Sequence, residues 1–220
     1  MIGIGLNQIY VPYVSSAAPE WWEVDGYTTL LAYKAVGVAT LAESKINLAN
    51  PGTNDLTDGD VAPPTMVAGG WSFTAGSTQA LHMTVSPAFA TTTLLIHCAN
   101  DPLGISAIGG QADTTNSLYL RQLSGKLRWY NGALGNISST FDGPAVTGWA
   151  GLNLYKDGAD IGDIHPAIGF GGIYPYIGAY NSNGTENQYY TGIIGSLILI
   201  DGVLTQPLVA ALSTTMAELT

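Results

Sequence analysis

Charged residues are scarce in this sequence, and positive charge is the scarcest of all. Only 10% of the 220 residues are charged, where about 25% is usual for a soluble protein. Six Lys and Arg stand against sixteen Asp and Glu, which gives a formal net charge of -10. Such a chain repels the phosphate backbone of DNA or RNA, so we exclude nucleic-acid binding as its function.

Cysteine is nearly absent, which excludes a second class of protein. The single Cys98 has no partner for an internal disulfide, so the chain is not a disulfide-stapled scaffold. Cys98 ends the apolar run 93–98, and this position predicts a buried thiol. Because burial in an acidic protein disfavours the thiolate, we do not expect thiol catalysis.

Long apolar runs are also lacking. None reaches the roughly 20 residues that span a bilayer, and the first residues carry no basic start. We therefore expect neither a membrane anchor nor a secretory signal. At this length, folding should bury about 70% of the surface of the unfolded chain, which is enough for one domain with a sizeable core.

The sequence does contain many stretches in which apolar and polar residues alternate, and these predict strands with one buried face. Two hairpins are the clearest. Strands over 117–123 and 126–130 are joined by the two-residue connection Ser124-Gly125, and a strand through 150–155 is reversed at Asp157-Gly158. The run 189–200 is long and apolar enough to lie in the interior of a sheet.

Helix is expected in two places only. A short helix is predicted near 39–46. A second helix follows Thr205, an N-cap residue type, with Pro207 in the first turn. Its apolar positions Val209, Leu212, Met216 and Leu219 form one stripe that should pack on the edge of the β-structure, which leaves Ser213 in solvent.

We interpret residues 1–220 as a single domain. An N-terminal strand and an irregular lead-in occupy 1–67, a β-core occupies 68–204, and the C-terminal helix occupies 205–220. Alternation over 2–14, with Pro12 inside it, predicts an edge strand that could add to a neighbouring subunit or to the edge of its own sheet.

Several segments together resemble a known superfamily. Residues 70–81 begin Gly-Trp-Ser-Phe-Thr, the hairpin 154–159 reads Leu-Tyr-Lys-Asp-Gly-Ala, and 176–180 reads Tyr-Ile-Gly-Ala-Tyr before Tyr-Thr-Gly-Ile-Ile-Gly at 190–195. These segments resemble the concanavalin A-like lectin/glucanase superfamily, in the laminin-G-like form found in phage and prophage proteins. Upstream, 42–53 is similar to a segment that precedes this domain in phage-encoded proteins.

The resemblance spans about 68–219, and it implies a fold and a role. The fold is all-β, a two-sheet antiparallel jelly-roll sandwich of concanavalin A-like form with a short C-terminal helix. The role is virion-associated or glycan-facing. Composition and alternation alone indicate only an antiparallel β-domain.

Catalytic residues are not evident. The glucanases of this superfamily carry acidic residues at alternate positions of one strand, since a retaining glycosidase needs two carboxylates about 5 Å apart. Here Glu23-Val24-Asp25 is the one such pair, with Tyr27 in place of a third acid, and we interpret it as a solvated loop. His97 lies in an apolar strand and is expected to be a hydrogen-bonded structural histidine. We predict that the chain is not an enzyme.

No metal ligands or cofactor are predicted, because the three histidines His82, His97 and His165 lack the spacing of a zinc site. The alternative of structural calcium stays open. Hard oxygen ligands are available in two groups, Asn54, Asp55, Asp58 and Asp60, and Asp157, Asp160 and Asp163.

One loop has the composition of a glycan-binding site. Sugars are held by amides and carboxylates that match their hydroxyls and by aromatic rings that cover their C–H faces. The alternative interpretation is a polar hairpin tip whose tyrosines pack on their own sheet. The candidate glycan-binding residues are Tyr174, Tyr176, Asn181, Asn183, Glu186, Asn187 and Tyr189.

The resemblance therefore implies a non-enzymatic bacteriophage virion structural protein with a lectin-like fold, in the tail, a tail fibre or the capsid decoration. Its partners would be other virion proteins or copies of itself in a homo-oligomer. It would be made in the bacterial cytoplasm and end on the virion surface. The alternative is a carbohydrate-binding adhesin module that recognises bacterial surface polysaccharide, and a glycoside hydrolase is the third hypothesis.

Overall fold

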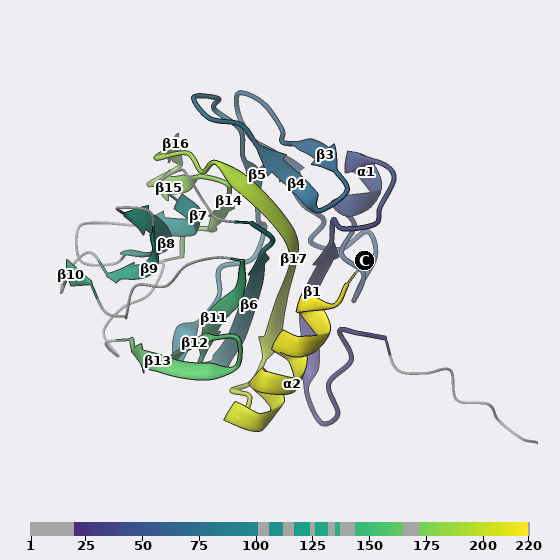
Figure 1. Cartoon of the computed structure of the whole chain (residues 1–220), viewed down its shortest axis with the longest axis vertical. Coiled ribbons are helices and arrows are strands. Elements are labelled where there is room, and N and C mark those ends of the chain that lie inside the picture. The colour runs from purple at the N-terminus through teal and green to yellow at the C-terminus, as the bar shows by residue number, and fades with distance from the viewer. Residues whose placement is uncertain are drawn as a thin grey trace, which may run out of the picture.

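A computed structural model of the chain describes residues 20–100, 106–111, 117–123, 126–131, 135–136, 144–164 and 172–219. Figure 1 shows two β-sheets and a C-terminal helix on the outer side of one of them. The predicted edge strand at 2–14, the connection Ser124-Gly125 and His165 lie outside the described residues. None of the described helices is long and apolar enough to cross a membrane.

The first sheet, sheet A, contains eight strands of the described chain, ordered β13-β12-β11-β6-β17-β4-β3, with β1 also beside β17. The predicted interior strand is β17, which pairs with β6 along one edge and with β4 and then β1 along the other. The strands are β1 Thr28–Lys34, β3 Thr65–Val67, β4 Gly70–Phe73, β6 Thr92–Cys98, β11 Ala145–Ala150, β12 Asn153–Lys156, β13 Ala159–Asp163 and β17 Gly192–Asp201.

The second sheet, sheet B, has the order β10-β9-β8-β7-β14-β5-β2, with β15 paired to β7 and β16 paired to β15. β8 and β9 pair antiparallel up to Leu123 opposite Lys126, which confirms the predicted hairpin strands. The strands are β2 Thr57–Asp58, β5 Leu81–His82, β7 Ser106–Gln111, β8 Ser117–Leu123, β9 Lys126–Asn131, β10 Gly135–Asn136, β14 Tyr176–Ile177, β15 Tyr180–Ser182 and β16 Thr185–Asn187.

The expected wholly antiparallel pairing is wrong at one place in sheet B. β15 pairs with β7 in parallel, with Asn181 opposite Gly110. The preceding β14 is antiparallel to the same strand. Between β14 and β15 the chain turns back at Gly178, whose φ of 80° is left-handed. Its amide donates to the carbonyl of Ala107 on β7, so the reversal takes place against β7 itself.

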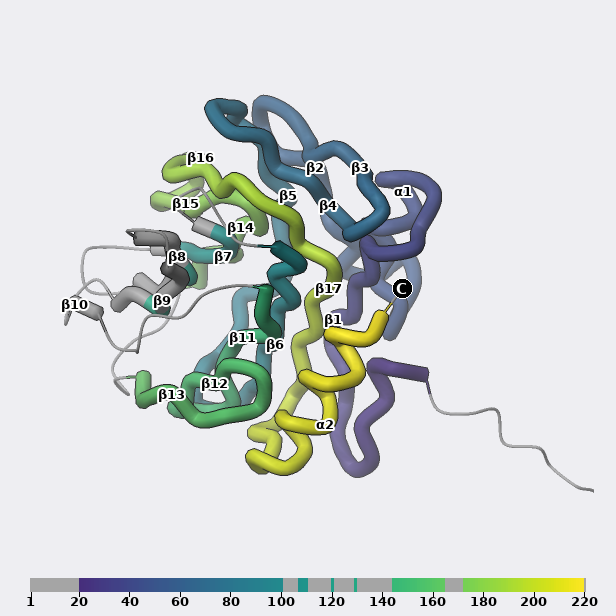
Figure 2. Tube along the Cα trace, in the orientation of Figure 1, coloured from purple at the N-terminus to yellow at the C-terminus, as the bar shows by residue number. Residues whose placement is uncertain are grey.

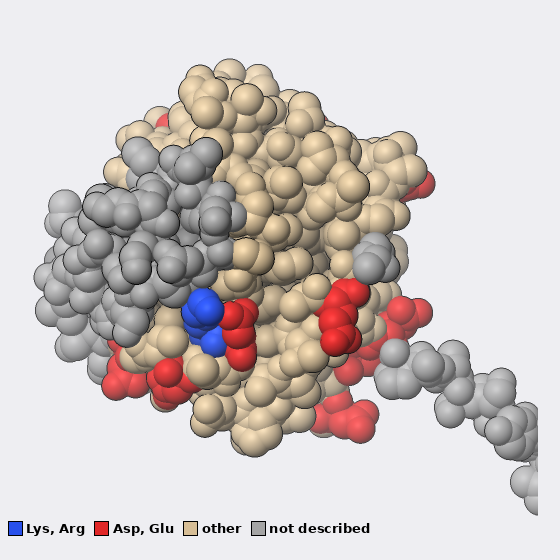
Figure 3. Space-filling model, in the orientation of Figure 1, with Lys and Arg blue, Asp and Glu red and all other residues tan. Residues whose placement is uncertain are grey.

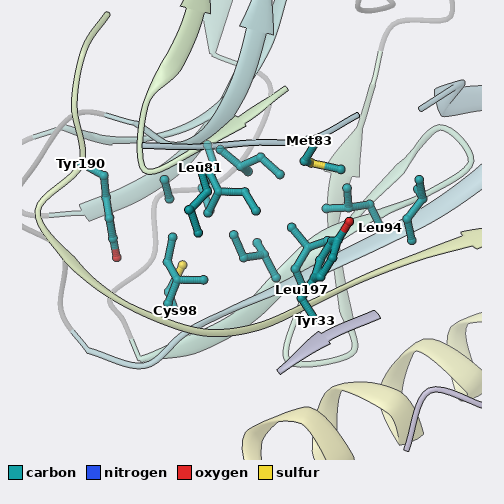
Figure 4. Close-up of a cluster of buried hydrophobic side chains, with 14 of the residues drawn as sticks. Tyr33, Leu81, Met83, Leu94, Cys98, Tyr190 and Leu197 are labelled. Atoms are coloured by element: carbon teal, nitrogen blue, oxygen red, sulfur yellow. The ribbon is translucent and has the colours of Figure 1, made fainter. Parts of the chain in front are cut away.

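One apolar core lies between the two sheets. It contains Trp149 and Leu197 from sheet A and Leu81 and Trp129 from sheet B. The rings of Trp129 and Trp149 meet edge to face, with centroids 5.6 Å apart. Figure 4 shows Leu81 and Met83 across this core from Leu197 and Tyr33. Side chains of both sheets share this core, so the sheets pack face to face.

Cys98 points into the same core and is fully buried, as predicted. Burial raises the pKa of its thiol to about 12, and the nearby hydroxyl of Tyr190 opposes the shift only in part. Figure 4 shows both side chains at one end of the core. The thiol is therefore protonated at neutral pH, and thiolate chemistry is not available to it.

The C-terminal helix α2, Gln206–Ala217, covers the outer face of sheet A. Val209, Leu212 and Met216 are buried, as the stripe predicts, but they pack over the face of the sheet, against residues such as Leu95. The expectation of an edge contact is therefore wrong. Ser213 is also buried, at 2% exposure, because a helix lying across a broad sheet buries more than one stripe.

The local turn and cap signals have mixed outcomes. Thr205 precedes α2, but its side chain makes no capping hydrogen bond. The shorter helix α1, Leu41–Ser44, lies within the predicted 39–46 and begins with a capping box between Thr40 and Glu43. The hairpin at Asp157-Gly158 is confirmed, since both residues have positive φ, 48° and 78°.

The predicted continuous strand over 150–155 is wrong. The chain turns at Gly151, with a φ of 60°, so that β11 ends at Ala150 and β12 begins at Asn153. The amide of Gly151 donates to the carbonyl of Thr92 on the neighbouring chain segment. Alternation persists through a two-residue reversal, so the pattern alone could not reveal this turn.

Candidate binding site around Glu186

The loop predicted to bind glycans is a hairpin formed by β15 and β16. Ser182 pairs with Thr185, and the two residues between them, Asn183 and Gly184, have φ of 51° and 89°. Asn-Gly is the residue pair that this tight turn favours. Asn181 reinforces the turn, because its Oδ1 accepts from the amide of Gly184 at 2.7 Å. Figure 2 shows the hairpin beside β14 and β5.

Glu186 on β16 is the most buried acidic side chain of the site, with 3% of it exposed. Its Oε1 lies 2.7 Å from His82 Nε2 and accepts from the backbone amide of Asp60 at 2.6 Å. Its Oε2 accepts from the hydroxyl of Tyr189 at 3.4 Å. A Cβ on Gly59 would lie 2.5 Å from Oε1, so the glycine leaves room for the carboxylate. The carboxylate is therefore held by partners from three separate segments.

His82 and Tyr176 form the floor of the site on the outer face of sheet B. They stand opposite each other in the pairing of β5 with β14, and their rings stack with centroids 3.8 Å apart and an interplanar angle of 11°. Their strand neighbours Leu81 and Ile177 belong to the core between the sheets. Since side chains alternate along a strand, His82 and Tyr176 face outward.

The site carries a negative field. The pKa of Tyr176 is raised by burial and by the charges of Asp60 and Glu186. The pKa of Tyr189 is raised by burial, by Glu186 and by Asp60. Both phenols are therefore neutral at physiological pH and act as hydrogen-bond donors and acceptors.

Three potential metal ligands meet in the same place. One ligand atom each from Asp60, His82 and Glu186 lie within 4.8 Å of one another, the one such group of three in the described part of the chain. Two of the residues suggested as calcium ligands, Asp55 and Asp58, make other contacts with their carboxylates. Asp55 Oδ1 accepts from two backbone amides, and Asp58 forms an ion pair with Lys45 at 2.9 Å.

The seven predicted glycan-binding residues do not all belong to this site. Tyr176, Glu186 and Tyr189 converge. Tyr174 lies near the hairpin, because its carbonyl accepts a hydrogen bond from the side-chain amide of Asn181 at 2.6 Å, and its side chain is half exposed. Asn181 is buried, and its side chain hydrogen-bonds to backbone atoms of Tyr174 and Gly184, so it is a structural residue.

The other two predicted amides lie on the outside of the hairpin. Asn183 occupies the turn, and Asn187 Oδ1 accepts from the backbone amide of Gln188 at 2.8 Å. The packing of Tyr189 with Tyr176 and Ala80 agrees with the alternative view that the tyrosines pack on their own sheet.

Sequence reasoning missed Asp60 and His82 as members of this site. They are 126 and 104 residues away from Glu186 along the chain. Asp60 was considered only as an oxygen ligand for calcium, and His82 only as one of three histidines. No local spacing signals that these residues meet, because strand pairing in sheet B brings them together.

The Glu23 and Asp25 pair lies at a different place, beside a hollow of about 460 Å³ that Trp22, Tyr27 and Thr29 also line. A smaller hollow of about 250 Å³ lies between this segment and α2. Figure 3 shows acidic atoms in separate clusters on this face of the molecule, with broad uncharged surface between them.

His97 differs from its prediction. Its Nδ1 is buried and has no hydrogen-bond partner, so the expected hydrogen bond at that nitrogen is absent. Burial lowers the pKa of the imidazole, and Asp157 opposes that shift. His97 is therefore a neutral, partly buried side chain of β6 rather than part of the Glu186 site.

Comparisons with known proteins concern the fold. No protein-family model matches the chain, and no curated protein matches its sequence. Trypanosoma rangeli sialidase bound to 2,3-difluorosialic acid is similar in structure, with a TM-score of 0.56 and 15% identity over 90% of this chain and 33% of that one. A T. rangeli sialidase mutant with trans-sialidase activity gives 0.55 and 14% identity over 86% of this chain and 33% of that one.

Domain 4 of AbnA, a GH43 arabinanase from Geobacillus stearothermophilus in complex with arabinotriose, matches 85% of this chain and 98% of that domain at 14% identity. Its TM-score of 0.48 is too low to carry an argument. The chain spans about a third of the length of the sialidases. Its mostly β, two-sheet fold is similar to part of the T. rangeli sialidases, and none of the comparisons points to a phage or to the laminin-G-like form.

Proposed function

We propose that the chain is a non-enzymatic carbohydrate-binding module of concanavalin A-like jelly-roll form, and that it binds glycans at the Glu186 site. The supporting observation is the convergence of Asp60, His82 and Glu186 beside the rings of Tyr176 and Tyr189 on the outer face of sheet B. A few convergent polar groups next to aromatic faces are what recognition of a sugar requires.

The polar groups of the site are held in place before any ligand arrives. Glu186 is fixed by His82 and by the amide of Asp60, and His82 is fixed by its stacking on Tyr176. Fixed side chains lose little rotamer freedom on binding, which favours affinity. Tyr174, at 50% exposure, offers the most accessible aromatic ring near the hairpin.

The charge of the site indicates the class of sugar. Two carboxylates and a formal net charge of -10 repel anionic ligands. Although the similar structures include sialidases, we expect this site to bind neutral or amino sugars rather than sialic acid. Neutral sugar hydroxyls can donate to Asp60 and accept from the hydroxyl of Tyr176.

A hydrolase is the competing function, because Asp60 and Glu186 lie close enough for paired carboxylates. Their arrangement favours binding. The backbone amide of Asp60 donates to Glu186 Oε1 at 2.6 Å, so the two residues are in direct contact. A glycosidase needs its two carboxyl groups on either side of the scissile bond.

The virion-surface location and the assembly into a homo-oligomer stay predictions.

The test is glycan-array binding by the purified chain and by Glu186→Gln and Tyr174→Ala. We expect binding to neutral polysaccharides, reduced roughly 10- to 100-fold in Glu186→Gln, because a hydrogen bond to a charged group is lost. Asp58→Asn is the matched control, since its carboxylate pairs with Lys45 at the end of α1 and not with the Glu186 site.

Three outcomes would overturn the proposal. A folded chain that binds no glycan would remove the function. Loss of binding in Trp22→Ala but not in Glu186→Gln would move the site to the hollow beside Glu23 and Asp25. Release of reducing ends that stops in Glu186→Gln would make the chain a hydrolase.

A further inference from the structure

The group Asp60, His82 and Glu186 combines two carboxylates with one imidazole. Each residue comes from a different segment: the loop after β2, the strand β5 and the strand β16. We propose that these three side chains bind one divalent transition-metal ion, with Zn²⁺ as the ion that the ligand set favours. The proposal is independent of glycan binding and concerns the same side chains.

The ligand types select the class of metal. Zn²⁺ binds histidine nitrogen and carboxylate oxygen, whereas Ca²⁺ takes six to eight oxygen ligands. His82 therefore argues against calcium at this place. Three protein ligands leave at least one coordination position for water or another oxygen donor.

Metal binding requires two adjustments of the geometry, one between His82 and Glu186 and one at Asp60. His82 Nε2 and Glu186 Oε1 are 2.7 Å apart. Around an ion with bonds of about 2.0–2.2 Å, neighbouring donors lie roughly 3.0–3.5 Å apart, so this pair has to open by about half an ångström. Asp60 is exposed, so its carboxylate can approach from solvent without disturbing the core.

Charge balance also favours a cation. Glu186 is almost fully buried, and the carboxylate of Asp60 lies beside it. Two described lysines, Lys45 and Lys156, form their ion pairs with other acids, Asp58 and Asp157. A divalent ion between the two carboxylates would replace their mutual repulsion by attraction.

The surrounding residues would orient the ligands. Tyr176 stacks on His82 and fixes its ring plane, while Tyr189 and the amide of Asp60 hydrogen-bond to Glu186. Such outer contacts are a regular feature of protein metal sites. The spacing along the sequence could not indicate the site, since Glu186 is more than a hundred residues away from both Asp60 and His82.

The test is titration of the tag-free full chain with ZnCl₂ and, in parallel, with CaCl₂ by calorimetry. We expect one Zn²⁺ per chain and no comparable Ca²⁺ binding. His82→Gln and Asp60→Asn should each weaken Zn²⁺ binding at least 10-fold, and Asp58→Asn, the control on the adjacent strand, should not change it. At 100 times the dissociation constant, Zn²⁺ should raise the thermal midpoint by roughly 5–10 °C.

Equal affinity in His82→Gln and in the unaltered chain would overturn the proposal, as would Ca²⁺ binding as tight as Zn²⁺ binding. If a variant fails to fold, the unaltered chain still decides the matter. Mn²⁺ should broaden the amide resonances of Asp60, Leu81 and Glu186 and spare those of α2. Uniform broadening, or broadening confined to other segments, would contradict the site. Glycan binding can fail while Zn²⁺ binding persists, so the two proposals are separable.

Discussion

Replacing Asn47 by alanine should destabilise the fold more than any other exchange of one polar side chain that we consider. Asn47 is fully buried and uses its whole amide. Its Oδ1 accepts from the amides of Ala32 at 3.0 Å and Ala49 at 3.2 Å, and its Nδ2 donates to the carbonyls of Leu30 and Thr53, each at 2.9 Å.

The reason lies in the position of β1 beside β17. One edge of β1 pairs with β17, and the segment that follows α1 lies along its other edge. There the side chain of Asn47 hydrogen-bonds to the carbonyl of Leu30 and the amide of Ala32, and the amide of Leu48 donates to the carbonyl of Ala32. The side chain thus takes the place of a neighbouring strand, and its loss leaves backbone groups of β1 unpaired in a buried place.

The magnitude follows from the count of bonds. Four hydrogen bonds at about 0.5–1.5 kcal/mol each predict a loss of about 2–6 kcal/mol in the free energy of unfolding for Asn47→Ala. Domains of ordinary stability have about 5–15 kcal/mol in all, so the effect is a large fraction. Urea denaturation followed by tryptophan fluorescence measures it, with an unchanged slope against denaturant as a check on the two-state treatment.

Asn153→Ala is the matched control. Its amide makes one exposed hydrogen bond, to Asp160 at 3.0 Å, so its removal should change stability by less than about 1 kcal/mol. A loss of less than about 0.5 kcal/mol in Asn47→Ala would refute the argument that these four bonds hold the outer edge of β1.

Two further predictions concern the core. Gly178→Ala should lower stability by about 2–5 kcal/mol, because φ is 80° and the new Cβ would lie 2.0 Å from Phe73 Cε1. Gly52→Ala is the control, because Gly52 has a similar φ of 83° but open space around it, and it should lose only about 1 kcal/mol. Equal losses of the two variants in thermal unfolding would contradict the clash with Phe73. Cys98 keeps its proton in the folded state to a pKa of about 12, so the thiol of the unfolded chain loses its proton first. The contribution of Cys98 to stability should therefore fall from pH 9 to about 12, by at most about 1.4 kcal/mol per pH unit. In Cys98→Ala this part of the fall should vanish, and an unchanged pH slope would disprove the assignment.

Local chemistry made several elements predictable. Asp157-Gly158 specified a tight hairpin because the two residues accept positive φ, and the stripe of Val209, Leu212 and Met216 specified a helix with one buried side. The apolar run of β17 specified an interior strand, since a strand covered on both faces need not alternate. In each case the signal lies within about a dozen neighbouring residues.

The same local rules misjudged features that depend on distant partners. The turn at Gly151 rests on a hydrogen bond to Thr92, and the burial of Ser213 rests on how α2 lies across sheet A. The parallel pairing of β15 depends on the reversal at Gly178 against β7. Each was decided by a neighbour in space that has no fixed position in the sequence.

The candidate site shows most clearly which features the sequence determines and which depend on the tertiary structure. The sequence by itself determined a mostly β chain with a C-terminal helix and indicated Tyr176, Glu186 and Tyr189 from the composition of one loop. Only the tertiary structure decided that Asp60 and His82 join Glu186. Strand pairing is a contact between segments far apart along the chain, and its register is set by the packing of the whole sheet, so it can gather a carboxylate, an imidazole and a second carboxylate that no sequence spacing connects.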